Sequence, residues 1–194
     1  AGLKRGTLTK EERDKRVSLV APSLDLEDAK DADIVVEAVF EEMALKKQIF
    51  GALDRIVKKG AILATNTSYL DVDQIAASTS RPEDVLGLHF FSPANIMRLL
   101  EIVRGAKTAP DVLKTAMELA PKIGKVPVAV GVCYGFVGNR MLSQRNEQSE
   151  RLLIEGALPH EIDAAMVNFG FRMGPFAARD LAGLDIGWRI RKQT

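Results

Sequence analysis

Two short apolar runs, separated by an amphipathic stretch, constrain the fold of this chain more than any other feature. Residues 34–39 and 61–65 are rich in Ile, Val, Leu and Ala, and such runs are typical of parallel strands that a sheet buries on both faces. Between them, residues 41–57 carry apolar side chains at helical spacing. A strand, a helix and a second strand in this order predict the right-handed crossover of a parallel sheet, and hence an α/β fold.

Two further apolar runs, at residues 85–91 and 99–103, flank a short segment that contains Pro93 and Asn95, which predicts strand, loop and strand. If the loop centres on Asn95, His89 lies opposite Glu101 in an antiparallel pair, where side chains touch. A carboxylate beside an imidazole orients the ring and fixes its tautomer. The pair therefore predicts the His–carboxylate unit of a general base, with a structural ion pair as the alternative.

Polar residues follow the first two predicted strands. Ser68 comes just after the second strand, and ligands of open α/β sheets bind outside the carboxyl ends of the strands. Ser68 is therefore a candidate binding residue; capping of a short helix at residues 71–77 is the other interpretation, and both can hold. Glu41 follows the first strand in the same way, and Lys46 lies five residues further on. From spacing alone, we interpret Glu41 and Lys46 as an ordinary surface pair.

The remaining elements divide the chain into two parts. Thr9 and Glu12 have the spacing of a capping box, which predicts a solvent-exposed helix at residues 10–17. A helix is predicted at residues 111–123, followed by a strand at residues 125–130 that Pro127 assigns to a sheet edge. After a hinge, only helical patterns follow, at residues 136–156, 159–170 and 173–181. We therefore expect an α/β domain over residues 1–132 and the beginning of an all-α domain over residues 133–194.

Asn139 lies at this hinge, in the first turn of the long predicted helix. A neutral amide in that position can donate a hydrogen bond to a polarised oxygen. Asn139 is therefore a candidate substrate contact, with helix capping or hinge packing as the alternative.

Composition excludes several classes of protein. The 27 basic and 26 acidic side chains give a net charge of +1, so no nucleic-acid partner is expected. No apolar run is long enough to span a bilayer, and no signal peptide is recognisable at the start. A single cysteine, Cys133, rules out an intramolecular disulfide and a thiolate zinc cluster, so no metal site is expected. A reducing interior compartment fits this cysteine content.

Six short motifs, taken together and in order, resemble the L-3-hydroxyacyl-CoA dehydrogenases, and most of all the dehydrogenase part of multifunctional β-oxidation enzymes. The motifs are VEAVFE at residues 36–41, TNTS at 65–68, GLHFFSP at 87–93, LEIV at 100–103, GFVGNR at 135–140 and MGPF at 173–176. The late segment at residues 180–185 fits as well. The resemblance implies a Rossmann-like NAD-binding domain followed by an all-α domain, and an acyl-CoA substrate.

The resemblance also implies a role for each candidate residue. His89 would take the proton of the 3-hydroxyl, Glu101 would orient His89, and Ser68 would hydrogen-bond the reacting oxygen near the nicotinamide. Asn139 would contact the substrate from the second domain. Ser92 stands where relatives commonly carry Asn. The implied NAD contacts are Val39, Phe40, Glu41, Lys46, Ser68 and Ser92.

The family's first βαβ unit, with its Gly-rich turn for the NAD pyrophosphate, has no counterpart in these residues. We therefore expect a partial Rossmann-like domain within a longer enzyme that oxidises L-3-hydroxyacyl-CoA to 3-oxoacyl-CoA. We also expect the chain alone to be inactive and to bind NAD poorly. A homodimer or a multifunctional complex is the expected context. The alternatives are a dehydrogenase of 3-hydroxybutyryl-CoA or of a 3-hydroxy acid, and a non-catalytic scaffold domain.

Overall fold

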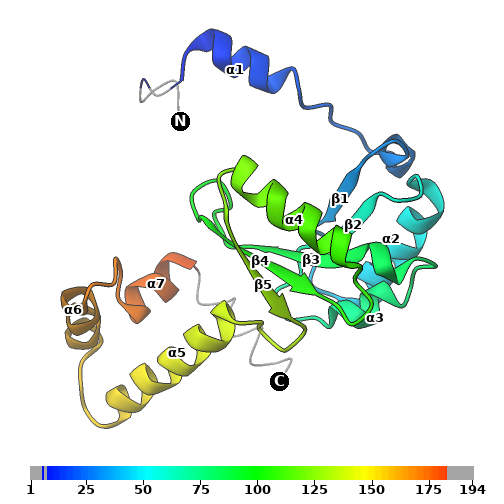
Figure 1. The fold of residues 1–194 in the computed structure, drawn as a ribbon. Coiled ribbons are helices and arrows are strands. Elements are labelled where there is room, and N and C mark those ends of the chain that lie inside the picture. The colour runs from blue at the N-terminus through cyan, green and yellow to red at the C-terminus, as the bar shows by residue number, and fades with distance from the viewer. Residues whose placement is uncertain (1–5, 7, 183–194) are drawn as a thin grey trace.

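A five-stranded sheet organises the first two thirds of the chain, in a computed structural model that describes residues 6 and 8–182 (Figure 1). The strands lie in chain order, with β1, β2 and β3 parallel, β4 antiparallel to β3, and β5 parallel to β4. Their bounds are β1 Ile34–Glu37, β2 Ile62–Thr65, β3 Val85–Phe90, β4 Leu99–Arg104 and β5 Val126–Gly131. The predicted crossover, the hairpin and the edge position of the Pro127 strand are all confirmed.

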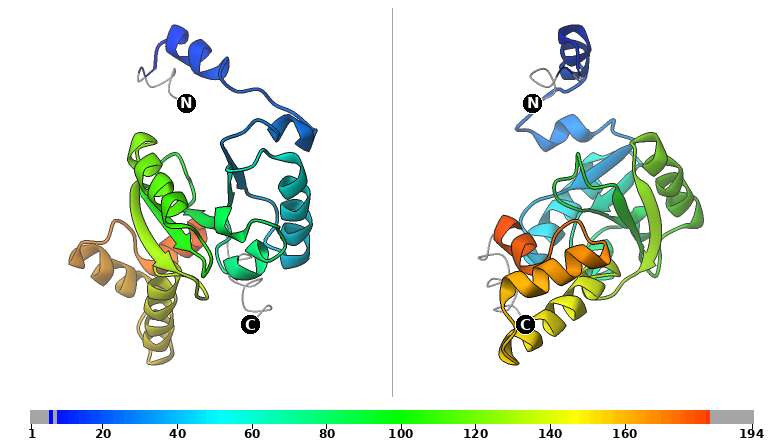
Figure 2. Two further views of the ribbon diagram at one scale, coloured as in Figure 1. Left: turned by 45° about the vertical axis from the view of Figure 1, so that its right-hand side comes forward. Right: turned by 90° about the vertical axis from the view of Figure 1, so that its left-hand side faces the viewer.

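Helices cover both faces of this sheet. Figures 1 and 2 show α4 on one face, and α2 with α3 on the other. A short 3₁₀ helix precedes β1 (Leu26–Ala29), and another precedes β3 (Pro82–Asp84). The α-helices are α1 Lys10–Val17, α2 Met43–Ile56, α3 Val72–Ala76, α4 Pro110–Lys122, α5 Gly138–Ile154, α6 Pro159–Phe169 and α7 Pro175–Ala182.

Alternation along each strand sends neighbouring side chains to opposite layers of the core. Ile62 and Ala64 of β2 pack with Ala116 on the α4 face, whereas Leu63 packs with Phe50 of α2 on the other face. Leu88 and Ile102, the neighbours of His89 and Glu101 in their strands, pack on the α4 face. The side chains of His89 and Glu101 therefore point to the opposite face, which carries α3.

The expectation that the first run is buried on both faces is wrong for β1. Val36 is 43% exposed. The reason is position: β1 lies at the edge of the sheet within the described residues, while α4 packs against β3, β4 and β5. Only Ile34 and Val35 reach the two apolar clusters.

The helical part follows β5 as predicted, and no strand occurs between residues 132 and 182. Helices α5, α6 and α7 pack against one another. Asp163 of α6 accepts hydrogen bonds from the backbone N–H groups of Phe176 and Ala177, both at 2.9 Å, which satisfies the first turn of α7. Arg179 of α7 pairs with Glu150 of α5 at 2.7 Å.

Helix α1 stands away from the sheet (Figure 1). The Thr9 hydroxyl accepts the Glu12 N–H, and the Glu12 carboxylate accepts the Thr9 N–H, so the predicted capping box is present. No residue of α1 is buried. The prediction of a solvated surface helix is confirmed.

Candidate functional site

His89 and Glu101 meet in the register that the sequence predicts. They are direct partners in the β3–β4 ladder, and Nδ1 of His89 lies 2.7 Å from Oε2 of Glu101. His89 is 4% exposed and Glu101 is 1% exposed. We assign the proton to Nδ1, because a carboxylate oxygen can only accept. This leaves the lone pair of Nε2 available as a base.

The second oxygen of Glu101 is also satisfied. Its Oε1 accepts N–H groups from Val137 at 3.0 Å and from Gly138 at 2.8 Å, where α5 begins. Donors of this kind favour a negative charge on the carboxylate, and so does the amino end of a helix. Glu101 therefore bridges the sheet and the helical part of the chain.

Aromatic rings enclose the imidazole. The ring centroid of His89 lies 4.5 Å from that of Phe91 and 5.5 Å from that of Phe136. Phe136 is fully buried. Gly138 has no room for a side chain, because a Cβ there would lie 2.7 Å from Cζ of Phe91. This packing restricts the orientation of the imidazole and excludes water from most of its surface.

Glu41 holds the loop that carries Ser68. Its Oε1 accepts the hydroxyl of Thr67 at 2.6 Å and the backbone N–H groups of Ser68 and Tyr69 at 2.8 and 3.0 Å. Ser68 itself is half-buried at the carboxyl end of β2. The alternative that Ser68 caps α3 is wrong, because Asp71 is the N-cap and accepts the N–H groups of the first turn.

Asn66 joins the carboxyl ends of β2 and β3. Its Oδ1 accepts the backbone N–H of Phe90 at 2.9 Å, one residue past His89. The loop with Ser68 and the strand with His89 are thereby tied together at one edge of the sheet. This is the edge where ligands of α/β sheets bind.

The interpretation of Glu41 and Lys46 as a surface pair is wrong. Lys46 is fully buried, and its Nζ lies 2.7 Å from Oε1 of Glu37 and 3.5 Å from Oε2 of Glu41. The first turn of α2 carries Lys46 back over the end of β1, where two carboxylates offset the cost of burying an ammonium. Sequence reasoning missed Glu37, although a charged residue inside an apolar strand is the same signal that identified Glu101.

The remaining predicted residues lie around this edge. Asn139 is the second residue of α5 and is half-buried, next to the N–H groups that bind Glu101. Phe40 is 85% exposed and Val39 is partly exposed, just past the end of β1. Ser92 is exposed in the loop between β3 and β4.

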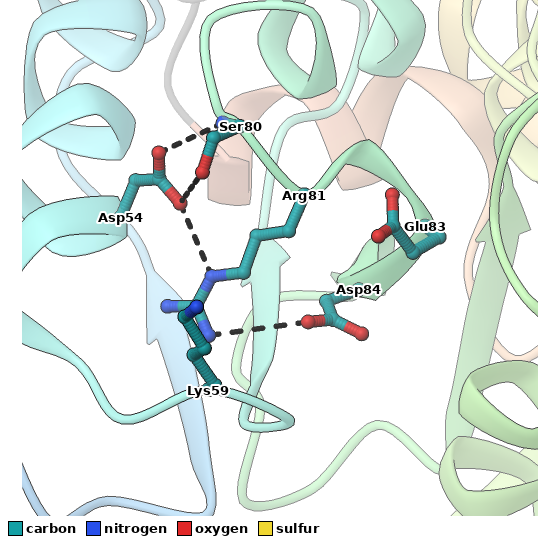
Figure 3. Close-up of a pocket in the computed structure, with 6 residues that line it drawn as sticks. All are labelled: Asp54, Lys59, Ser80, Arg81, Glu83 and Asp84. Carbon is teal, nitrogen blue, oxygen red and sulfur yellow. Dashed lines mark hydrogen bonds and ion pairs between the residues drawn. The ribbon is translucent and has the colours of Figure 1, made fainter.

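A cavity of about 320 Å³ lies at the opposite edge of the sheet (Figure 3). Its lining residues precede β2 and β3, whereas His89 is near the end of β3. Arg81 is held there by Asp54 at 3.2 Å and by the carbonyls of Val57 and Lys58 at 3.0 and 2.7 Å. The lining consists of Asp54, Lys59, Ser80, Arg81, Glu83 and Asp84.

The carboxyl groups of this cavity differ in their electrostatics. Burial raises the pKa of Asp54, but hydrogen bonds from Ser80 and the neighbouring Arg81 outweigh it, so the pKa of Asp54 lies below its ordinary value. Burial raises the pKa of Asp84, and the more distant Arg81 offsets only part of this. Since Arg81 binds carbonyls and carboxylates of the chain itself, we interpret this cavity as structural.

Two absences hold for residues 6 and 8–182. No group of three or more His, Cys, Asp or Glu side chains there could hold a metal ion. No helix in the same range is both long enough and apolar enough to cross a membrane.

Comparison with known proteins identifies both parts of the chain. The family profile described as 3-hydroxyacyl-CoA dehydrogenase, NAD binding domain, matches residues 1–133. The profile described as 3-hydroxyacyl-CoA dehydrogenase, C-terminal domain, matches residues 135–194.

Curated relatives and solved structures agree with these matches. The chain is 55% identical over 178 residues to the peroxisomal bifunctional enzyme of Danio rerio, covering 92% of the chain and 25% of that protein. It is 43% identical over 189 residues to the fatty acid oxidation complex subunit alpha of Shewanella amazonensis, covering 97% of the chain and 27% of that protein. The crystal structure of 3-hydroxybutyryl-CoA dehydrogenase from Escherichia coli superimposes with a TM-score of 0.91 at 38% identity, covering 95% of this chain and 40% of that one. The chain thus spans about a quarter of the length of the curated relatives that it matches.

Proposed function

This chain belongs to the 3-hydroxyacyl-CoA dehydrogenase family, and we propose that the protein containing it oxidises L-3-hydroxyacyl-CoA to 3-oxoacyl-CoA with NAD. The observation that carries the proposal is the buried His89–Glu101 pair at 2.7 Å. A general base must be oriented and must keep a free lone pair, and this pair provides both. The fatty acid oxidation named in the bacterial relative is the corresponding process.

The proton leaves the substrate through His89. Nε2 takes the proton of the 3-hydroxyl as the C3 hydride departs, and the imidazolium that forms is stabilised by the carboxylate of Glu101 through Nδ1–H. The chemistry that NAD supplies when bound is acceptance of that hydride. In the reverse direction, the same imidazolium returns the proton to the 3-oxo oxygen.

Ser68 and Asn139 supply the polar contacts of the substrate. Ser68 lies on the loop that Glu41 holds, and its hydroxyl would hydrogen-bond the reacting oxygen beside the nicotinamide. Asn139 approaches from the first turn of α5, where its amide can donate to a substrate oxygen. Both groups come from elements anchored by carboxylates, which limits the loss of conformational freedom on binding.

The cofactor would lie along the carboxyl ends of β1, β2 and β3. The apolar strip of Val39 and Phe40 would pack against it, and the hydroxyls of Ser68 and Ser92 would donate hydrogen bonds. Lys46 contributes through Glu41, whose position it fixes at 3.5 Å. We propose that the cofactor-binding part ends near residue 132 and that the helical part begins at residue 133.

The cellular context is proposed from the relatives. An acyl-CoA is the substrate partner, and a homodimer or a multifunctional complex is the assembly. The protein would work in the cytoplasm of a bacterium, or in the peroxisome or mitochondrial matrix of a eukaryote, and the name of the Danio rerio relative supports the peroxisome.

The test is a pair of histidine substitutions in the longer protein that contains this chain. His89→Gln removes the base and should lower kcat by at least about 100-fold while the protein folds normally. His160→Gln changes the exposed histidine at the start of α6 and should leave kcat unchanged. Near-full turnover of His89→Gln would remove His89 from the role of base.

A second candidate substrate is 3-hydroxybutyryl-CoA, because the Escherichia coli dehydrogenase with that name superimposes on 95% of the chain. Comparing kcat/KM across acyl-CoA chain lengths from four carbons upward separates the two proposals. A maximum at four carbons favours the short substrate, and a maximum at longer chains favours the long ones. Activity on none of them, in the complete protein, would favour a scaffold role.

A further inference from the structure

The turn that leads into α5 holds Glu101 from the side opposite His89. One carboxylate oxygen accepts the N–H groups of Val137 and Gly138, while the other lies 2.7 Å from the imidazole. Consecutive backbone N–H groups that converge on one oxygen form a small anion-binding concavity. The carboxylate that orients His89 is therefore itself oriented by backbone atoms of the helical part.

Two left-handed residues in succession shape this concavity. Gly135 has φ +69° and Phe136 has φ +48°. Phe136 is the one residue other than glycine with a positive φ in the described ranges. An L-amino acid adopts this conformation at a cost and keeps it only where the surroundings demand it. Here the surroundings are the buried ring of Phe136, packed 5.5 Å from the ring of His89.

We propose that Gly135 and Phe136 are positioning residues for the His89–Glu101 pair. Their left-handed turn directs the Val137 and Gly138 N–H groups onto Oε1 of Glu101, and this fixes Oε2 on Nδ1 of His89. The imidazole is thereby kept in the tautomer that leaves Nε2 free to accept a proton. The mechanistic meaning of this arrangement rests on the proposed function, but the arrangement itself exists without substrate or cofactor.

The matched variants replace two glycines that both have a positive φ. Gly135→Ala places a Cβ in the left-handed region, 3.2 Å from Cβ of Asn139, on the turn itself. Gly124→Ala places a Cβ at φ +76° after α4, where the surrounding space is open. Both variants strain one left-handed residue, and only Gly135→Ala lies on the turn that holds Glu101.

The primary measurement is the ¹⁵N NMR spectrum of the histidine side chains above the pH at which imidazoles titrate. The chain has two histidines, so exposed His160 serves as the internal reference for buried His89. The unaltered protein and Gly124→Ala should show His89 protonated on Nδ1 alone, and Gly135→Ala should show both tautomers. A pure Nδ1–H tautomer in folded Gly135→Ala would overturn the proposal.

A second measurement covers the case in which Gly135→Ala does not fold. Glu101→Ala removes the carboxylate that accepts the Val137 and Gly138 N–H groups. Hydrogen exchange of these two amides should then become at least tenfold faster, while the exchange rates of amides in the interior of α5 stay the same. Unchanged exchange at both amides would overturn the proposal.

Kinetics separate this inference from the proposed function. In the longer protein, Gly135→Ala should lower kcat at least tenfold with little change in the KM for NAD, and Gly124→Ala should alter neither. A protein that shows the tautomer change but oxidises no 3-hydroxyacyl-CoA would refute the proposed function and leave the positioning role standing.

Discussion

Glu37 and Lys46 form an ion pair that the fold encloses almost completely, with Oε1 and Nζ 2.7 Å apart and side chains 2% and 1% exposed. Glu37 also accepts the hydroxyl of Thr65 at 2.8 Å and the backbone N–H of Val39 at 2.7 Å. One buried charge pair therefore joins β1, β2 and the first turn of α2. The same ammonium approaches Glu41, which holds the loop of Ser68, so the pair lies directly beneath the proposed site.

Removing the cation of this pair should destabilise the fold strongly. Lys46→Met leaves the Glu37 carboxylate buried without its ion partner, and we expect the free energy of unfolding to fall by about 3–5 kcal/mol. Lys47→Met is the matched control, because Lys47 is only half-buried and its Nζ makes one long hydrogen bond at the surface, to Gln74 at 3.4 Å. This substitution should cost less than about 1 kcal/mol. Urea denaturation measures both, and equal stability of the two variants would contradict the assignment of Lys46 to the core.

The two aspartates of the cavity at the amino edge should respond oppositely to substitution. The pKa of Asp54 is lowered in the folded state, so its stabilisation is present above the ordinary pKa of an aspartate and is lost as the pH falls through the folded value. At neutral pH, Asp54→Asn should cost about 2 kcal/mol, and the difference from the unaltered protein should shrink in acid.

Asp84→Asn is the control within the same cavity. The pKa of Asp84 is raised by burial, so the contribution of this carboxyl is present at low pH and is lost as the pH rises. We expect Asp84→Asn to be neutral or slightly stabilising at pH 7. Thermal unfolding of both variants between pH 3 and 7 tests these opposite effects on stability. A larger loss of stability for Asp84→Asn than for Asp54→Asn at pH 7 would contradict our interpretation of the cavity.

Lys125 should hold the loop that carries Ser92. Its Nζ donates to the carbonyl of Met97 at 2.7 Å and to that of Ala94, and it lies 5.8 Å from the ring centroid of Phe90. Lys125→Met removes these bonds, so limited proteolysis should cut within residues 92–98 several-fold faster. Lys122→Met, at the exposed end of α4, should not change the rate of cleavage in that loop. Equal cleavage of both variants would mean that the loop is held by other contacts.

NAD should bind weakly to the 194-residue chain by itself. No G-x-G turn occurs anywhere in its sequence, and backbone N–H groups of such a turn are the usual cradle of the pyrophosphate. Isothermal titration calorimetry should therefore show no saturable binding in the micromolar range. Micromolar affinity would show that the exposed residues after β1 and β2 suffice to hold the cofactor.

The sequence predicted the elements whose signal is local and periodic. Short apolar runs located the strands, and the pairing of His89 with Glu101 followed from the centre of the loop alone. Capping at Thr9 and the edge position of Pro127 also depend on near neighbours, and both are confirmed.

What the sequence did not reveal depends on contacts between distant segments. Lys46 is buried because the first turn of α2 directs it toward Glu37 at the end of β1. The spacing of residues within one helix reveals neither that direction nor the position of Glu37. The hydrogen bond that the N–H of Gly138 donates to Glu101 joins two parts of the chain, and nothing local to either residue signals it. Val36 is exposed because α4 does not extend over β1, and an apolar run in the sequence does not indicate which strands a helix covers.

The position of β1 at the edge of the sheet has a practical consequence for handling this chain. Its outer backbone N–H and C=O groups pair with no strand in residues 6 and 8–182, and Val36 and Phe40 expose apolar surface beside them. An open edge of this kind templates the addition of a foreign strand. When produced alone, the chain should therefore self-associate through β1 in proportion to its concentration, and charged substitutions at that edge are the first remedy to apply.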